Sequence, residues 1–171
     1  MTNLTGLPSY FWIISSAVLK GPVPDDIEYT SGALQRDLFR VQTAWDDCQA
    51  SRNRDAIYSY LSSVFNLVAW WDAENRAVER ARKVLTLKNI RRYHREEPFA
   101  AIIRCTADPA KVDKRTRSKW SRVLRYALEH KSDSASLEQF IKRKGGINEC
   151  ASRYARRCSP KSRDAAKHNI R

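Results

Sequence analysis

Residues 91–97, with the sequence RRYHREE, hold side chains that could cleave a phosphodiester bond. A histidine can act as a general base, and neighbouring carboxylates can hold a metal ion that activates water. Three arginines crowd the same stretch, however, and solvated charge beside an anion-binding surface explains all seven residues without chemistry. We therefore predict that the protein is not an enzyme and has no catalytic residues.

The other potential metal ligands are spaced unfavourably. Residues 25–26 and 46–47 are adjacent aspartate pairs, and neighbouring side chains in a helix diverge by about 100°, too far to clamp one metal ion. The cysteines, which include no C-x-x-C motif, are Cys48, Cys105, Cys150 and Cys158. We expect buried or idle thiols, no metal site and no cofactor, and this cysteine usage fits a reducing cytoplasm.

Charge is distributed unevenly along the chain. The 171 residues carry 32 Lys and Arg against 19 Asp and Glu, which gives a net charge of +13 and a pI near 9.9. Residues 1–75 hold five basic and nine acidic side chains and residues 76–171 hold 27 and ten, so their net charges are −4 and +17. A basic field of this size attracts polyanions over a Debye length. Nucleic acid, either DNA or RNA, is the expected partner of the second half.

An amphipathic helix predicted over residues 113–130 provides the first candidate contacts. At about 100° per residue its apolar side chains share one face, and these are Trp120, Val123, Leu124, Ala127 and Leu128. The opposite face carries Arg115, Ser118, Lys119, Arg122 and Tyr126. We expect the cations to bind phosphate oxygens and Tyr126 to stack on an unpaired base. The predicted phosphate contacts beyond this helix are Lys142, Arg143, Lys144, Arg153, Arg156 and Arg157.

Residues 136–157 match the layout of a helix-turn-helix unit. Ser136 is placed to cap a short helix, Gly145 and Gly146 end it, and an amphipathic stripe with three arginines follows. In such a unit the second helix enters the major groove of DNA. The alternative is an ordinary helical hairpin with a basic exterior.

The first half of the chain is predicted to fold as an antiparallel helical hairpin over about residues 33–85. Apolar side chains recur at spacings of four and three over residues 33–49. After a break at residues 50–53, the seven-residue repeat of Ile57, Val64, Trp71, Val78 and Leu85 predicts one longer helix. Two helices joined by a tight link pack antiparallel. The expected fold class is therefore mainly α.

Residues 86–107 are predicted to connect this bundle to the basic region. Within them, residues 99–105 are apolar and fit either one short strand or a buried helical turn. Asp108 and Pro109 fit the cap and first position of a new helix. The predicted organisation is an acidic and aromatic bundle over 1–85, this connector, a basic region over 108–158 and a flexible basic tail over 159–171.

A further short helix is predicted over residues 9–20, and it is apolar on nearly every side. Its side chains Tyr10, Trp12 and Ile14 are expected either in the core or at an interface with a protein partner or a second copy. The apolar run over residues 10–19 is too short to span a bilayer, and no basic residue precedes it as in a secretory signal. We expect a cytoplasmic protein, associated with the nucleoid if it binds DNA, and no contact with a membrane.

Two functions fit these observations. The first is a non-enzymatic nucleic-acid-binding protein, whose basic helical second half contacts the phosphate backbone. The second is a small interaction protein, such as an inhibitor or an accessory subunit of a nucleic-acid-processing complex, which docks on an acidic protein partner.

Overall fold

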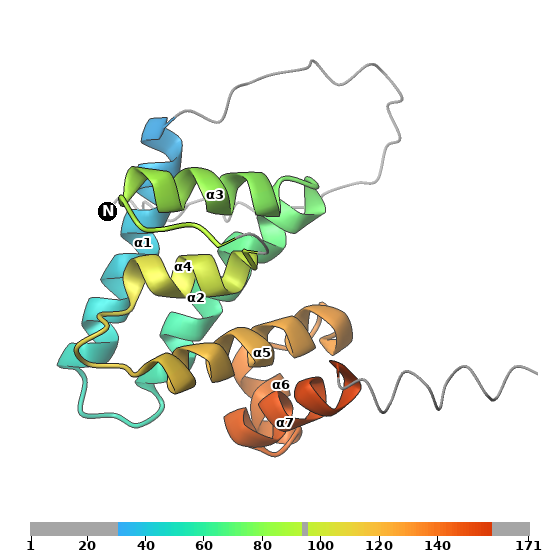
Figure 1. Ribbon diagram of the computed structural model, residues 1–171. Coiled ribbons are helices and arrows are strands. Elements are labelled where there is room, and N and C mark those ends of the chain that lie inside the picture. The colour runs from blue at the N-terminus through green and yellow to red at the C-terminus, as the bar shows by residue number, and fades with distance from the viewer. Residues whose placement is uncertain (1–30, 94–95, 159–171) are drawn as a thin grey trace, which may run out of the picture.

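The computed structural model describes residues 31–93 and 96–158, and all regular structure in these ranges is α-helical (Figure 1). The helices are α1 Ser31–Ala50, α2 Ala56–Ala73, α3 Ala77–Leu87, α4 Pro98–Thr106, α5 Lys114–His130, α6 Leu137–Arg143 and α7 Gly146–Cys158. The predicted helical fold class is confirmed. The helix predicted over residues 9–20, with Tyr10, Trp12 and Ile14, and the tail predicted over residues 159–171 lie outside the described residues.

Helices α1 and α2 form the hairpin that the apolar spacing predicts. Leu34, Leu38, Val41 and Trp45 are buried along one side of α1. After the link at residues 51–55, α2 runs back alongside α1 (Figure 1). Neither helix, nor any other in the described ranges, is long and apolar enough to span a membrane.

The single long helix predicted up to Leu85 is wrong, because the chain turns at Asn75. This residue has a φ of 56°, a left-handed conformation that asparagine tolerates better than most residues. The N–H of Arg76 donates to the Trp71 carbonyl at 2.9 Å, which satisfies the end of α2 and completes a Schellman-type cap. As α3 leaves in a new direction, Val78 of the predicted apolar seam is 45% exposed.

The strand considered for residues 99–105 is also wrong, since these residues belong to α4. Glu97 caps this helix by accepting hydrogen bonds from its first free N–H groups, and Pro98 occupies the first helical position. Phe99, Ile102 and Ile103 are buried. The apolar run therefore lacks the alternation of a surface strand because α4 is covered on several sides.

Three aromatic rings tie the two halves of the sequence into one core. The ring centroids of Trp45 on α1 and Tyr60 on α2 are 5.0 Å apart, and Trp120 on α5 lies 6.2 and 5.9 Å from them. Each edge-to-face pair adds about 0.5–1.5 kcal/mol to the burial of its rings. The Tyr60 hydroxyl shares a 2.8 Å hydrogen bond with Thr106 of α4. The main cluster of buried residues includes side chains from all seven described helices.

The predicted helix over residues 113–130 is confirmed, but it begins after the Asp108–Pro109 pair. Asp108 accepts a hydrogen bond from the Ala110 N–H within a turn. Asp113 caps α5 instead, because its carboxylate accepts the Thr116 N–H at 2.7 Å.

The last two helices follow the predicted helix, glycine turn and helix layout. Ser136 and Gln139 form a capping box at the start of α6. Gly145 and Gly146 have φ values of 96° and 90°, in a region where a side chain would be strained. This turn brings α7 back onto α5 (Figure 1), with Cys150 and Ala151 buried.

The left-handed conformation of Asn75 gives the first testable prediction. Replacing Asn75 with alanine should lower the free energy of unfolding by about 1 kcal/mol, because a β-carbon disfavours this conformation. Replacing it with glycine should change the free energy by less than about 0.5 kcal/mol. Urea denaturation followed by circular dichroism measures both. Equal stability of the alanine and glycine variants would show that the turn imposes no left-handed backbone.

Candidate nucleic-acid interface

The first half of α5 concentrates positive charge that no described carboxylate neutralises. Within this half of the helix, every basic residue lacks an ion pair with a described residue, and these are Lys114, Arg115, Arg117, Lys119 and Arg122. Arg115, Lys119 and Arg122 follow spacings of four and three, which places them along one side of the helix as predicted. Arg115 is exposed, and Lys119 and Arg122 are partly exposed. We call these three residues the α5 stripe.

Tyr126 does not belong to the exposed face, so its predicted stacking role on a base is wrong. Its side chain is only 6% exposed, because α6 and α7 cover the second half of α5. Its ring stacks on His130 with 4.4 Å between centroids and lies 5.8 Å from Phe140 of α6. Helical periodicity places Tyr126 one turn after Arg122 but does not show where a neighbouring helix begins to cover that face.

The predicted phosphate contacts at the end of α6 differ in their ion pairing and exposure. The Lys142 ammonium lies 2.7 Å from the carboxylates of Asp55 and Glu138, and these hydrogen bonds raise the pKa of Lys142. Lys142 therefore links α6 to the residue that precedes α2. Arg143 is exposed, and Lys144 is partly buried.

The predicted contacts on α7 are ion-paired. Arg153 and Arg156 lie 2.9 and 3.0 Å from the carboxylate of Glu149, and Arg157 lies 3.1 Å from that of Glu129. These carboxylates offset part of the positive charge on α7. Among the predicted phosphate contacts, the α5 stripe, Arg143 and Lys144 thus have no ion pair with described residues, and the stripe is the largest such group on one helix.

A cavity of about 520 Å³ lies beside the α5 stripe. We call it the α4–α5–α7 cavity, because it is lined by α5, by α7, and by α4 with described residues that precede it. Its α5 lining follows a helical repeat and consists of Lys114, Arg117, Ser118, Ser121, Arg122 and Arg125. Tyr93, Glu96, Glu97 and Arg104 contribute from the α4 side, and Tyr154 and Cys158 contribute from α7. The walls thus hold five basic and two acidic side chains, and Arg122 belongs to both the stripe and the cavity.

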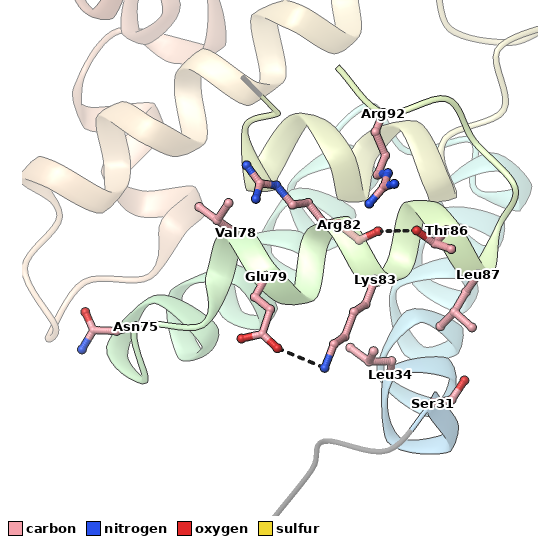
Figure 2. Close-up of a pocket in the computed structure, with 10 residues that line it drawn as sticks. All are labelled: Ser31, Leu34, Asn75, Val78, Glu79, Arg82, Lys83, Thr86, Leu87 and Arg92. Atoms are coloured by element: carbon pink, nitrogen blue, oxygen red, sulfur yellow. Dashed lines mark hydrogen bonds and ion pairs between the residues drawn. The ribbon is translucent and has the colours of Figure 1, made fainter. Parts of the chain in front are cut away.

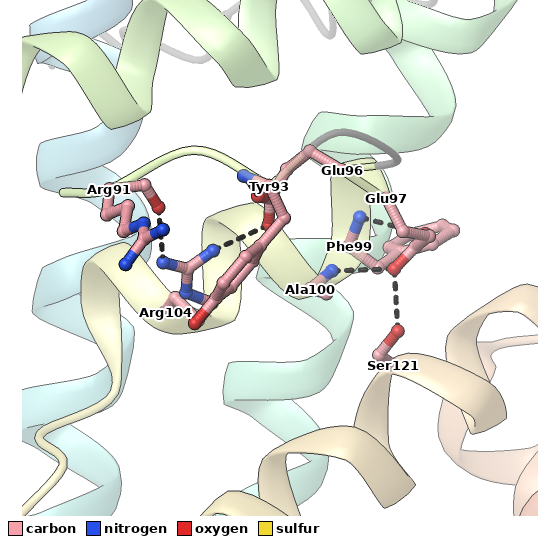
Figure 3. A network of polar contacts seen from close by, with 8 residues as sticks. All are labelled: Arg91, Tyr93, Glu96, Glu97, Phe99, Ala100, Arg104 and Ser121. Carbon is pink, nitrogen blue, oxygen red and sulfur yellow. Dashed lines mark hydrogen bonds and ion pairs between the residues drawn. The ribbon is translucent and has the colours of Figure 1, made fainter.

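Both acidic side chains in the cavity already form hydrogen bonds and ion pairs within the protein. Glu97 accepts hydrogen bonds from the N–H groups of Phe99 and Ala100 at 3.0 and 2.7 Å (Figure 3). The same carboxylate accepts the Ser121 hydroxyl at 2.6 Å (Figure 3) and lies 3.1 Å from the Arg125 guanidinium. One carboxylate therefore starts α4, fixes α4 to α5 and neutralises Arg125.

Glu96 positions an exposed aromatic ring in a similar way. It accepts the Tyr93 N–H at 2.9 Å and pairs with Arg104 at 2.7 Å. The Arg104 guanidinium also donates to the Arg91 carbonyl and lies 4.5 Å from the centroid of the Tyr93 ring (Figure 3). Tyr93 is held in this arrangement while 60% of it stays exposed.

Part of the cavity lining could have been predicted from the sequence. The spacing of Lys114, Arg117, Ser118 and Ser121 marks a second polar side of α5, adjacent to the stripe. The involvement of Tyr93 and Arg104 has no comparable local signal, because contacts across α4 and α5 bring them to the cavity.

The described carboxylates of the RRYHREE stretch make structural contacts. Glu96 and Glu97 bind cations and N–H groups, and His94, the histidine considered above as a general base, lies outside the described residues. No group of three or more His, Cys, Asp or Glu in the described ranges could hold a metal ion. Burial raises the pKa of the Cys105 thiol to about 12, so this thiol is protonated at neutral pH.

A second hollow, of about 630 Å³, lies between the start of α1 and the outer side of α3 (Figure 2). Leu34, Val78 and Leu87 give it apolar walls. On the α3 wall, Lys83 pairs with Glu79 one turn earlier at 3.0 Å (Figure 2). Since none of its described lining residues is aromatic, this hollow offers no stacking platform for a nucleobase.

Comparison with known protein families, with curated proteins and with solved structures finds no match for this chain.

The engagement of Glu97 gives the second prediction. Replacing Glu97 with alanine should lower the free energy of unfolding by about 2–4 kcal/mol, because two N–H groups, a hydroxyl and a guanidinium lose their acceptor. Urea denaturation followed by circular dichroism measures this loss.

The matched control is Glu129→Ala, which removes a carboxylate that is 47% exposed and pairs with Arg157. This control should change the free energy of unfolding by less than about 0.5 kcal/mol. If the two variants were equally stable, the hydrogen bonds of Glu97 would not join α4 to α5 as argued.

Proposed function

We propose that the protein binds nucleic acid through its phosphate backbone, without a chemical step, and that the α5 stripe is the main contact. The observation that carries this proposal is the set of five basic residues over positions 114–122 that form no ion pair with described residues. Cations in a stable surface network gain little from a new anion, whereas uncompensated cations gain a partner. A polyanion supplies many such partners at once.

The chemistry of the stripe suits phosphates. Arg115 and Arg122 present guanidinium groups, which can hold two phosphate oxygens in a planar fork. Lys119 lies between them and adds a point charge. The distance from position 115 to position 122 along the axis is about 10 Å, the length of about three nucleotides along one strand of a duplex.

The remaining predicted contacts extend this surface. Arg143 is exposed on α6, and Arg153, Arg156 and Arg157 on α7 can exchange an exposed carboxylate for a phosphate. We assign the three α7 arginines a secondary role, since each exchange gives up an existing ion pair. Insertion of α7 into a major groove belongs to this proposal as one mode of binding.

The salt dependence of binding tests the proposal directly. Fluorescence anisotropy with duplex DNA, single-stranded DNA and RNA, at salt concentrations between roughly 50 and 300 mM, should show binding that weakens steeply with salt. If about six to ten phosphates are neutralised, the slope of log affinity against log salt should be near −5 to −9 on duplex DNA. A nearly flat slope contradicts the proposal. Binding that is weak and vanishes by physiological salt favours an acidic protein partner instead.

A charge reversal tests the assignment to the α5 stripe. Changing both Arg115 and Arg122 to glutamate should reduce affinity by at least about tenfold, because repulsion replaces two phosphate contacts. The circular dichroism spectrum should not change, since neither residue has an ion pair with described residues.

The matched control changes Arg36 and Arg40 to glutamate. These residues are exposed on α1, and the net charge changes by the same amount as in the stripe variant. We expect a much smaller loss of affinity. Equal losses in the two variants would show that net charge, and not the stripe, determines binding.

A further inference from the structure

We propose that the α4–α5–α7 cavity holds the terminal nucleotide of a strand that carries a phosphate monoester at its end. This inference rests on the proposed function, because the rest of the strand lies along the α5 stripe. It adds a specific site for one chemical group, a terminal phosphate attached to a nucleoside.

The size and position of the cavity fit such a ligand. Its volume of about 520 Å³ lies within the range of roughly 300–1,000 Å³ that is typical of small-ligand pockets. Arg122 lines the cavity and also belongs to the stripe. A strand that follows Arg115 and Lys119 towards Arg122 therefore reaches the cavity without leaving the protein surface.

The basic side chains of the cavity outnumber its carboxylates. Glu96 and Glu97 neutralise Arg104 and Arg125, which leaves Lys114, Arg117 and Arg122 without a carboxylate among the described residues. The Nε–H of Arg117 is buried and has no hydrogen-bond acceptor among those residues. A buried donor without an acceptor is unfavourable, so this group gains from an anion in the cavity.

A phosphate monoester offers these cations more negative charge and more acceptor oxygens than a backbone diester does. At neutral pH a monoester carries about −1.5 to −2 charges and three strong acceptor oxygens. A diester carries one charge, and its two ester oxygens are bonded to the chain on either side. Three cations around one cavity therefore favour the end of a strand over its interior.

The base of the terminal nucleotide has an aromatic partner at the same cavity. Tyr93 is 60% exposed, and the Arg104 guanidinium fixes it from one side at 4.5 Å from the ring centroid. On the α7 side, Tyr154 receives a 3.2 Å hydrogen bond from Arg125. A base stacked on Tyr93 gains from a ring that is already held in place.

The decisive measurement compares the binding of strands with and without a terminal phosphate. The probes are short oligothymidylates with a phosphate at the 5′ end, a phosphate at the 3′ end, or hydroxyls at both ends, compared by anisotropy at one salt concentration. One phosphorylated probe should bind about tenfold more tightly than the hydroxyl probe, because the monoester adds charge-assisted hydrogen bonds. Thymidine monophosphate, which shares the chemistry but lacks a strand, should bind more weakly because it does not reach the stripe.

Two matched double variants and two Tyr93 variants locate the preference. Lys114→Ala with Arg122→Ala should abolish the advantage of the phosphorylated probe. Arg115→Ala with Lys119→Ala should weaken all probes but keep their ratio. Tyr93→Leu should reduce binding of the phosphorylated probe, and Tyr93→Phe, which keeps an aromatic ring, should bind it as tightly as the unmodified protein does. The Tyr93 variants keep the test decisive if the Lys114 and Arg122 double variant fails to fold.

Cys158 supplies an independent readout in the unmodified protein. This thiol lines the cavity and is exposed, so a bound phosphorylated probe should slow its alkylation by iodoacetamide. Cys48 on α1 lies outside the cavity and serves as the internal control. Peptide mapping by mass spectrometry follows both thiols.

Each outcome separates this inference from the proposed function. Equal binding of phosphorylated and hydroxyl probes overturns the end site and leaves backbone binding intact. An advantage that survives the Lys114 and Arg122 change places the phosphate elsewhere and also overturns the site. Equal affinity for thymidine monophosphate and the phosphorylated strand assigns the cavity to a free nucleotide and overturns the strand end. Failure of every nucleic acid to bind overturns the proposed function itself.

Discussion

The carboxylate of Glu97 carries the constraint on which the arrangement of α4, α5 and the cavity depends. It accepts the first N–H groups of α4 and the Ser121 hydroxyl of α5, and it pairs with Arg125. These contacts satisfy groups that would otherwise be buried without partners, which makes the position of α4 against α5 costly to change. They also occupy the carboxylate completely. Lys114, Arg117 and Arg122 therefore have no carboxylate partner among the described residues.

The aromatic core fixes the position of α5, and with it the position of these basic side chains. Trp45, Tyr60 and Trp120 join α1, α2 and α5 in one packed cluster, although the two halves of the sequence carry opposite net charges. Attraction between the halves is a minor part of this association, since the Lys142 to Asp55 ion pair is exposed on both sides. Burial of aromatic surface holds the halves together. The α5 stripe of Arg115, Lys119 and Arg122 thereby stays on a solvent-exposed side of the helix.

Ion pairing divides the basic residues into two groups with different consequences. Lys142 and the arginines of α7 have carboxylate partners that stabilise local geometry. The cations over positions 114–122 have none among the described residues. A count of Lys and Arg treats both groups alike, yet the gain from a phosphate is larger where no carboxylate must first be displaced. The affinity that we propose for phosphates therefore depends on the pairing of the basic residues more than on their total number.

The sequence by itself determined the helical fold class, the extents of α1 and α5, the α6 cap and the glycine turn, because these depend on periodicity, capping and backbone preferences within a few residues. It also determined that Arg115, Lys119 and Arg122 share one side of α5. Only the tertiary structure decided that α2 ends before Asn75, that Tyr126 is buried and that Tyr93 meets α5 at a cavity. Apolar repeats continue across a turn without marking it, and the cover that α6 and α7 give to α5 depends on contacts between residues far apart in sequence. For the same reason, the sequence alone could not show which basic residues find a carboxylate.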